Sequence, residues 1–228
     1  MCAAVLTRAS GYLSAISLAA IAYAIFFRAS AIAGEGDAGR IVYFHVPMAW
    51  VAFLAFGIVL VASVGYLKTG NKRWDHLGRA SAEAGLVFTT LVLITGAIWG
   101  YPIWGTWWTW DPKLTTTLIL WFMYLAYLMV RSYAEPPRGP RFAAVVGIVA
   151  FVDVPIVYMA NYWWRTLHPP PALGPLAQDQ PSPTIVWLLM ASLVAFTIFF
   201  AFLVRVRMQI ETQEAELELR GELASARA

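Results

Sequence analysis

Charged residues are scarce in this chain. Of its 228 residues, 13% are charged and 60% are hydrophobic, whereas a soluble domain averages about a quarter charged residues. This composition indicates a polytopic membrane protein surrounded by lipid. The net charge of +3 gives no indication of nucleic-acid binding, and we expect no nucleic-acid partner.

Cysteine and the common catalytic motifs are also nearly absent. Cys2 is the single cysteine, which excludes an intramolecular disulfide and a cysteine-based metal cluster within one chain. There is no Cys-x-x-Cys-His sequence for covalent attachment of a c-type haem, and no glycine-rich phosphate loop for ATP hydrolysis. No Ser-His-Asp set or pair of catalytic carboxylates can be assembled on one face. We therefore expect a chain that is not an enzyme.

Long apolar runs are what the chain has in abundance. A helix that crosses a hydrocarbon core of about 30 Å needs roughly 20 apolar residues. Six runs reach that length, near residues 10–32, 42–67, 82–101, 113–131, 142–163 and 184–206. The first lacks a small-residue cleavage site, so we interpret it as a retained span rather than a signal peptide. The predicted fold is all-α, a single six-helix membrane domain over residues 1–228.

The distribution of Lys and Arg predicts the orientation of these spans. With six spans, both termini lie on one side of the membrane, and that side would carry twelve of the sixteen basic residues. The opposite side would keep only Arg28, Arg40, Lys113 and Arg165. Since basic residues concentrate in cytoplasmic loops, both termini are predicted in the cytoplasm. The charged tail, 205–228, would be cytoplasmic, with 211–220 a solvated continuation of the last helix.

A tryptophan-rich stretch lies between the third and fourth runs, in a predicted loop over 102–112 on the outer side. Its members are Trp104, Gly105, Thr106, Trp107, Trp108, Thr109, Trp110 and Asp111. One or two indoles would be explained by the aromatic belt at a membrane interface. Four within seven positions favour a broad apolar platform with N–H donors at its edges, which could hold a large planar ligand.

Two histidines are predicted on the same outer side as this loop. His45 opens the second span and His168 follows the fifth, whereas His76 lies in a predicted cytoplasmic loop as a solvated residue. A single interfacial histidine is more often a hydrogen-bonding side chain than a ligand. Two that flank a tryptophan platform favour paired axial ligands of a haem iron, with the macrocycle on the indoles.

Two acidic residues carry alternative interpretations. Asp111 followed by Pro112 is a typical helix start, with Asp111 as the N-cap, and it could also fix the loop or accept a hydrogen bond from an indole. Asp153 lies inside the fifth span, where a carboxylate is unfavourable, and Pro155 is expected to kink the helix beside it. Either a structural polar contact or a proton or substrate pathway would explain Asp153.

The stretch from Trp104 to Lys113 resembles the tryptophan-rich "WWD" signature of the haem-handling proteins of cytochrome c biogenesis. The short six-span chain and the segments around His45 and His168 are similar to the haem exporter protein C family of the bacterial cytochrome c maturation system. The resemblance covers essentially the whole chain. Pro169 stands where that family often has Gln after the second histidine.

The resemblance implies a function and a set of partners. The family holds non-covalent haem b at the periplasmic face of the bacterial inner membrane, with two histidines as axial ligands and the WWD loop around the macrocycle. It loads haem onto a periplasmic haem chaperone, together with an ABC-type ATPase subunit, a second membrane subunit and a small single-span subunit. By resemblance, the ligands here would be His45 and His168, and the haem-binding loop residues would be Trp104, Gly105, Trp107, Trp108, Trp110 and Asp111.

Two alternatives to haem transfer remain open from the sequence. The chain could be a permease subunit that conducts haem through the bilayer past Asp153. It could instead be a structural subunit whose tryptophan loop is a protein docking surface, in which case His45 and His168 would be dispensable.

Overall fold

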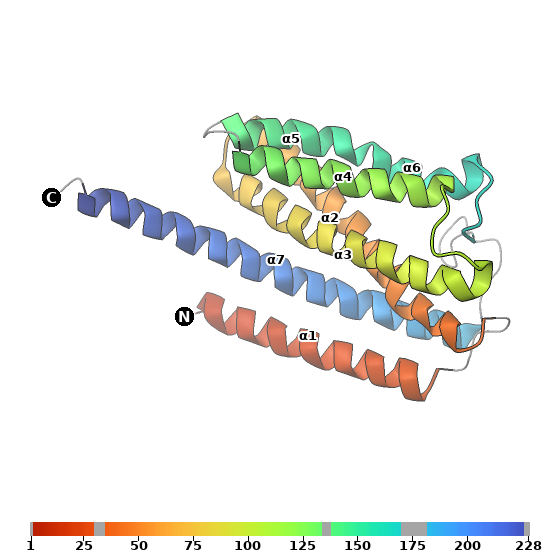
Figure 1. Ribbon diagram of the computed structural model, residues 1–228. Coiled ribbons are helices and arrows are strands. Elements are labelled where there is room, and N and C mark those ends of the chain that lie inside the picture. The colour runs from red at the N-terminus through yellow and green to blue at the C-terminus, as the bar shows by residue number, and fades with distance from the viewer. Residues whose placement is uncertain (1, 30–34, 134–137, 170–181, 226–228) are drawn as a thin grey trace.

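The computed structural model describes residues 2–29, 35–133, 138–169 and 182–225 (Figure 1). Within these ranges the chain is helical and contains no β-strand. The elements are α1 (Cys2–Phe27), the 3-10 helix η1 (Asp37–Ile41), α2 (Val42–Thr69), α3 (Lys72–Trp104), α4 (Pro112–Tyr133), α5 (Arg138–Phe151), α6 (Asp153–Trp163) and α7 (Pro183–Ser225). Six helical segments in this part of the chain are long and apolar enough to span a membrane, and α5 with α6 forms one of them. The predicted all-α fold with six spans is confirmed.

The helices extend beyond the apolar runs that predicted them. Helix α3 begins at Lys72, so His76 lies in its first turns and is half-buried rather than in a solvated loop. Helix α3 also continues through Pro102 to Trp104 and ends at Gly105, whose φ of 73° is the left-handed conformation typical of a C-terminal cap. The tryptophan loop is therefore shorter than 102–112. The end of the first predicted span, 30–32, lies outside the described residues.

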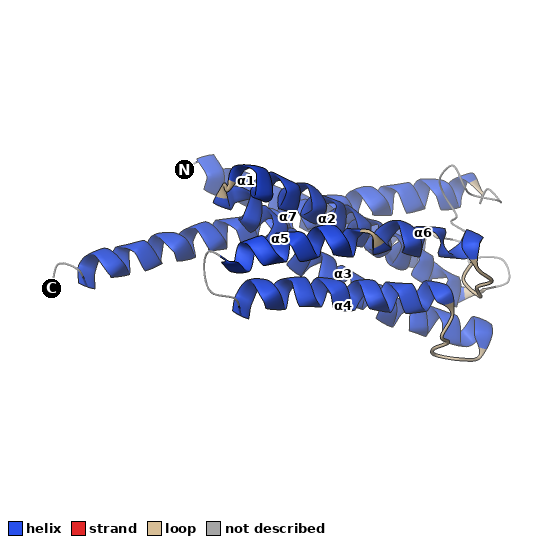
Figure 2. Cartoon of the chain, turned by 90° about the horizontal axis from the view of Figure 1, so that it is seen from above, coloured by secondary structure: helices blue, strands red, loops and turns tan. Residues whose placement is uncertain are grey.

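The fifth span is broken at Val152, between α5 and α6 (Figure 2). Pro155 has no N–H to bond the carbonyl of Phe151, and the Val152 N–H bonds the carbonyl of Val149 at 3.1 Å, a tighter turn than the α-helix. The predicted kink beside Asp153 therefore corresponds to a one-residue interruption of the helix at Val152, whose backbone angles remain helical.

Helix α2 is the central element of the bundle. It packs against α3, α5 and α7, while α4 packs against α3, α5 and α6, and α1 lies along α7. Small residues permit these close contacts: a Cβ at Gly85 would lie 2.7 Å from Phe56. The ring of Phe56 stacks on Tyr124 with centroids 3.6 Å apart. The resulting rigid core sets the relative positions of the helix ends, where the candidate site lies.

Both termini lie at one end of the bundle, the termini end. The α3–α4 connection, the end of α6 and the start of α7 lie at the other, the loop end (Figure 1). This arrangement agrees with an even number of spans.

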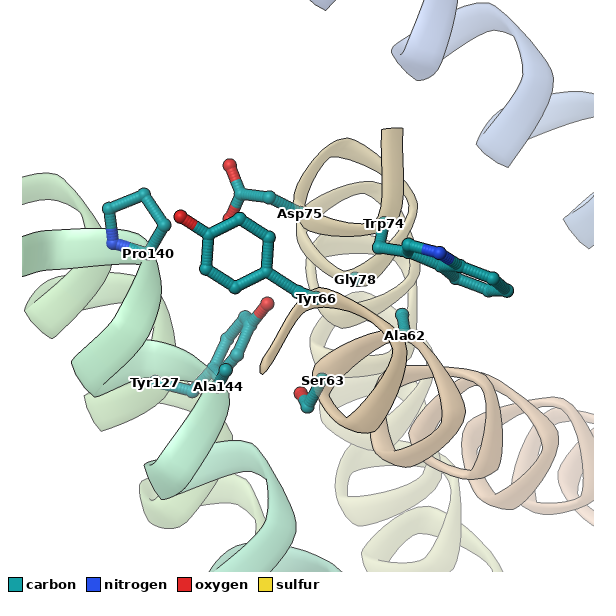
Figure 3. Close-up of a pocket in the computed structure, with 9 residues that line it drawn as sticks. All are labelled: Ala62, Ser63, Tyr66, Trp74, Asp75, Gly78, Tyr127, Pro140 and Ala144. Carbon is teal, nitrogen blue, oxygen red and sulfur yellow. The ribbon is translucent and has the colours of Figure 1, made fainter. Parts of the chain in front are cut away.

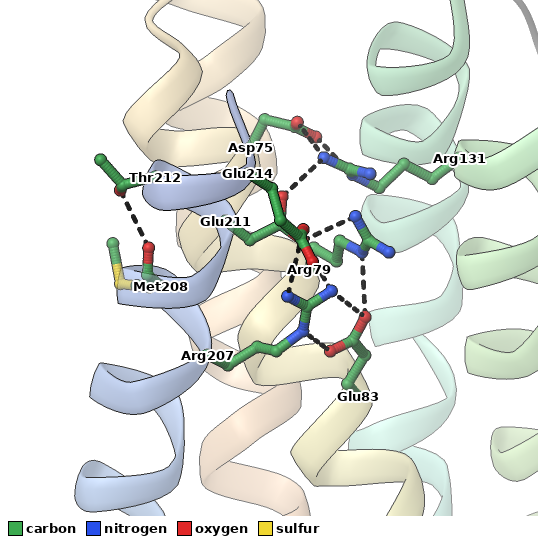
Figure 4. Close-up of polar contacts among 9 residues, drawn as sticks. All are labelled: Asp75, Arg79, Glu83, Arg131, Arg207, Met208, Glu211, Thr212 and Glu214. Atoms are coloured by element: carbon green, nitrogen blue, oxygen red, sulfur yellow. Dashed lines mark hydrogen bonds and ion pairs between the residues drawn. The ribbon is translucent and has the colours of Figure 1, made fainter. Parts of the chain in front are cut away.

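A cluster of ion pairs ties α7 to α3 and α4 at the termini end (Figure 4). The Glu211 carboxylate lies 2.6 Å from Arg79 Nη1 and 2.8 Å from Arg207 Nη2, and its side chain is only 7% exposed. Asp75, Glu83 and Arg131 complete the cluster. The prediction that 211–220 is solvated is therefore wrong for Glu211, because this carboxylate is buried among basic side chains of the bundle. Beyond it, α7 projects past the other helices (Figure 1).

Candidate functional site

The two predicted histidine ligands meet at the loop end. His45 lies in the first turn of α2, and His168 lies in the segment that follows α6. Their ring centroids are 6.4 Å apart, with an interplanar angle of 34°. The sequence separates these residues widely. Helix α2 packs against α5, and α6 packs against α4 and α5, so the bundle brings the start of α2 and the segment after α6 together.

His45 is buried against α3, with 7% of its surface exposed. Its Nδ1 lies 2.9 Å from the hydroxyl oxygen of Thr95, and its ring meets the edge of Trp99 at 5.6 Å between centroids. Gly96 allows this contact, because a Cβ there would lie 3.0 Å from His45 Cε1. One turn of α3 therefore holds the imidazole in a fixed orientation.

His168 is held by backbone carbonyls and by Asn161 of α6. Its Nδ1 lies 2.8 Å from the carbonyl oxygen of Pro169. The Asn161 side-chain amide donates to the carbonyls of His168, at 3.0 Å, and Pro169, at 2.6 Å. The segment after α6 is thus attached to the helix that precedes it.

Asp111 connects the tryptophan loop to the His168 segment. Its Oδ1 accepts the backbone N–H of Lys113 at 2.9 Å, which is the predicted N-cap bond of α4. The same carboxylate accepts the hydroxyl of Thr166 and the backbone N–H of Leu167, both at 2.7 Å. The backbone N–H of His168 in turn donates to the Thr166 hydroxyl at 3.1 Å. Asp111 therefore both caps α4 and fixes the loop. Among the described residues, no indole N–H donates a hydrogen bond to its carboxylate.

Charge and burial act together on His168. Burial has the largest effect and lowers the pKa of this imidazole, and the nearby Lys113 ammonium lowers it further. The hydrogen bond to the Pro169 carbonyl and the Asp111 carboxylate both raise the pKa. The net direction is down, so the ring is neutral at pH 7, which is the form that binds metals. The Lys113 ammonium itself donates to the carbonyl of Val157 at 2.7 Å.

The tryptophan loop does not form one flat plane. Trp107 stacks on Tyr101 with centroids 4.4 Å apart, whereas Trp108 and Trp110 meet edge-to-face at 84°. Trp104 packs on α3, since a Cβ at Gly100 would lie 2.8 Å from its ring. Trp107 and Trp110 are the exposed members, at 56% and 76%. The loop presents two separate indole faces instead of a continuous platform.

Asp153 is a second buried polar group of the fifth span. It is 6% exposed, and its Oδ2 has no hydrogen-bond partner among the described residues. Within the same ranges, no hydrogen bond or ion pair joins it to either histidine.

A small pocket between α2, α3, α4 and α5 lies at the opposite, termini end (Figure 3). Tyr66, Trp74 and Tyr127 line it together with Asp75, whose carboxylate already pairs with Arg131 at 2.7 Å. The described residues contain no group of three acidic, histidine or cysteine side chains that could hold a metal ion. Because the residues that line this pocket lie at the termini end, the pocket is separate from the histidine pair at the loop end.

Sequence reasoning missed four residues that shape the site: Thr95, Gly96, Asn161 and Thr166. Thr166 falls within the segment that carried the family resemblance, but its bond to Asp111 depends on the fold. Thr95 and Gly96 lie in an apolar run where a threonine or a glycine has no distinctive spacing. Only the contact between α2 and α3 shows their role.

The profile of one protein family, described as Heme exporter protein C, matches residues 1–221 of this chain. The chain belongs to the Heme exporter protein C family. The resemblance seen in the sequence is thereby confirmed, and with it the assignment to a family of multi-pass membrane proteins.

Individual relatives agree with the family assignment. Heme exporter protein C of Bradyrhizobium diazoefficiens is 36% identical over 170 residues, 74% of this chain and 65% of the relative. Heme exporter protein C of Haemophilus influenzae is 36% identical over 187 residues, 80% of this chain and 75% of the relative. A putative cytochrome c biosynthesis ccmC-like mitochondrial protein of Marchantia polymorpha is 34% identical over 140 residues, 61% of this chain and 59% of the relative. The match thus spans slightly less than two thirds of the first and third of these proteins.

Proposed function

We propose that this chain binds non-covalent haem b at the periplasmic face of the inner membrane, through His45 and His168, and passes it on for c-type cytochrome biogenesis. The observation that carries the proposal is the approach of these two rings to 6.4 Å between centroids. Since imidazole nitrogens bind metal ions at about 2 Å, two rings on either side of one ion would have centroids about 6 Å apart. The donor set therefore fits a bis-histidine iron.

The family supports the same function. The relatives are named for haem export and for cytochrome c biosynthesis, and iron in haem accepts imidazole at its axial positions. In the proposed complex the chain's residues bind and orient haem as cargo and carry out no reaction on it.

The loop residues Trp104, Gly105, Trp107, Trp108, Trp110 and Asp111 form the remainder of the proposed haem site. Trp107 and Trp110 are exposed at the loop end, where an apolar macrocycle could contact them and where a periplasmic haem chaperone could receive it. We further propose an ABC-type ATPase subunit, a second membrane subunit and a small single-span subunit as partners, by analogy with the family.

An absorption spectrum of the detergent-purified protein tests the proposal. We expect a low-spin bis-histidine spectrum after haem is added, and its loss or conversion to high spin in His45→Ala and His168→Ala. His76→Ala is the matched control, because His76 lies at the termini end. A wild-type protein that takes up no haem would overturn the proposal and leave the tryptophan loop as a docking surface.

Conduction of haem through the bilayer is the second candidate, favoured by the buried Asp153 carboxylate, whose Oδ2 has no hydrogen-bond partner in the described part of the chain. If Asp153 lines a conduction path, Asp153→Asn would stop haem from reaching the periplasm while leaving binding of external haem intact. Loading of the chaperone in cells, compared with haem titration of the purified variant, separates these effects. Normal loading in Asp153→Asn counts against conduction through this span.

A further inference from the structure

We infer that Thr95 and Asn161 are positioning residues that fix both imidazoles as the Nδ1–H tautomer, so that Nε2 of each ring is the ligand atom. This inference deepens the proposed haem site and rests on it for its functional meaning. The tautomers themselves are a property of the protein without haem.

The tautomer of His45 follows from the hydrogen bonds of Thr95. The Thr95 hydroxyl donates its proton to the carbonyl of Leu91, one turn earlier in α3, at 2.7 Å. A hydroxyl has one proton and two lone pairs, so toward His45 Nδ1, at 2.9 Å, the Thr95 oxygen is an acceptor. His45 must therefore carry its proton on Nδ1, which leaves the lone pair on Nε2.

The tautomer of His168 follows from the Pro169 carbonyl. A carbonyl oxygen can only accept, so the 2.8 Å contact with His168 Nδ1 requires a proton on that nitrogen. The side-chain amide of Asn161 holds this carbonyl at 2.6 Å and the carbonyl of His168 at 3.0 Å. Asn161 thereby fixes the turn that makes the imidazole contact possible.

The two positioning contacts are built differently but have the same consequence. At His45 the acceptor is the Thr95 hydroxyl, which donates its own proton to the carbonyl of Leu91. At His168 the acceptor is the backbone carbonyl of Pro169, which also accepts from the Asn161 amide. Metal-binding histidines commonly donate their second N–H to such an acceptor, which orients the ring and increases its basicity. Loss of an outer partner of this kind typically weakens metal affinity about 10–100-fold.

Nitrogen NMR of the histidine-labelled protein without haem tests the tautomers directly. The chemical shifts of the two ring nitrogens report which one carries the proton, and His45→Gln and His168→Gln assign the signals. We expect Nδ1–H for His45 and His168. His76, which has no hydrogen-bond partner among the described residues, should show the Nε2–H form that free imidazole side chains prefer. An Nε2–H signal from His45 or His168 would overturn the inference for that residue.

Variants of Thr95 test its role. Thr95→Val keeps the shape and removes the acceptor, so the His45 tautomer should become mixed, haem affinity should fall about 10–100-fold, and the midpoint potential of bound haem should rise. Thr95→Ser should restore all three. Thr89→Val is the matched control, since the Thr89 hydroxyl donates to the carbonyl four residues back at 2.7 Å in the same way, and the hydroxyl that faces His45 is that of Thr95.

Asn161→Asp tests the role of Asn161, because it replaces the amide that donates to the carbonyls of His168 and Pro169 with a carboxylate, which can only accept. We expect the same three changes at His168. Unchanged tautomers, affinity and potential in Thr95→Val and Asn161→Asp would overturn the inference, while loss of haem in His45→Ala would leave the proposed function standing. A wild-type protein with both Nδ1–H signals but no haem uptake would overturn only the proposed function.

Discussion

Asp111 joins the two halves of the site through a single carboxylate. It caps α4 and also holds Thr166 and Leu167, the residues just before His168. The tryptophan loop and the His168 segment therefore cannot move independently while this carboxylate is in place.

Asp111→Asn is expected to separate the two halves. The new amide cannot accept all three donors, so a buried donor is left without a partner, which costs about 1–3 kcal/mol of unfolding free energy. We expect a lower melting temperature and weaker haem uptake, measured by thermal unfolding and haem titration. Asp37→Asn is the control, because the Asp37 side chain is 87% exposed in its pair with Arg40. Haem affinity unchanged in Asp111→Asn would show that the His168 segment is held by other contacts.

Gly96 sets the clearance for the His45 ring. A Cβ at this position would lie 3.0 Å from His45 Cε1, so Gly96→Ala should displace the imidazole and reduce haem affinity several-fold, through loss of ligand orientation. The measurement is a haem titration of the purified variants. Gly57→Ala is the control, since its Cβ would have 3.9 Å to the nearest atom, in Phe151. Equal loss in both variants would indicate a general effect of alanine on these helices.

At the scale of elements, α7 is held at the termini end by charge and along α1 and α2 by apolar packing. The buried carboxylate of Glu211 faces Arg79 and Arg207, which are 25% and 23% exposed. Removal of one partner from a buried ion pair leaves the other charges uncompensated. The cluster is therefore expected to contribute stability without contributing to the proposed haem site.

Glu211→Gln should lower the free energy of unfolding by about 1–3 kcal/mol, less than for a fully buried pair because the arginines reach solvent. Haem binding should be unchanged, since the cluster and the histidines lie at opposite ends of the bundle (Figure 1). Thermal unfolding and haem titration measure the two effects. Glu214→Gln, at a side chain that is 57% exposed, is expected to change little. A haem defect in Glu211→Gln would reveal coupling between the two ends.

At the scale of the whole molecule, the fold places both termini at one end and the histidine pair at the other (Figure 1). The distribution of basic residues predicts which end faces the cytoplasm. The orientation stays a prediction, because the fold alone is the same in either orientation.

Labelling of single cysteines with a membrane-impermeant maleimide tests the orientation. In a Cys2→Ser background, Thr106→Cys at the loop end should be labelled from the periplasm of intact spheroplasts. Gly221→Cys, in the projecting part of α7, should react only after the membrane is opened. The reverse pattern would contradict the predicted orientation and, with it, a periplasmic haem site.

The sequence determined the features that depend on local composition and spacing. Apolar runs of sufficient length can satisfy their backbone hydrogen bonds in a bilayer only as helices or closed barrels, so the six spans followed from hydropathy. Asp111 before Pro112 predicted the start of α4, and Pro155 predicted the break beside Asp153, because both effects act within one turn of the chain. The candidate histidines could also be named, because imidazole chemistry and their predicted position on the same side of the membrane as the tryptophan stretch follow from the sequence.

Only the tertiary structure decided how these residues meet. The 6.4 Å approach of His45 to His168 depends on the packing of α2 against α5 and of α6 against α4 and α5. The partners Thr95 and Asn161 were not visible in the sequence, because a hydrogen bond between elements has no spacing that a linear pattern can reveal. Glu211 was expected in solvent for the same reason. Arg207 is its neighbour one turn away in α7, but Arg79 of α3 and Arg131 of α4 reach Glu211 only when these helices pack together.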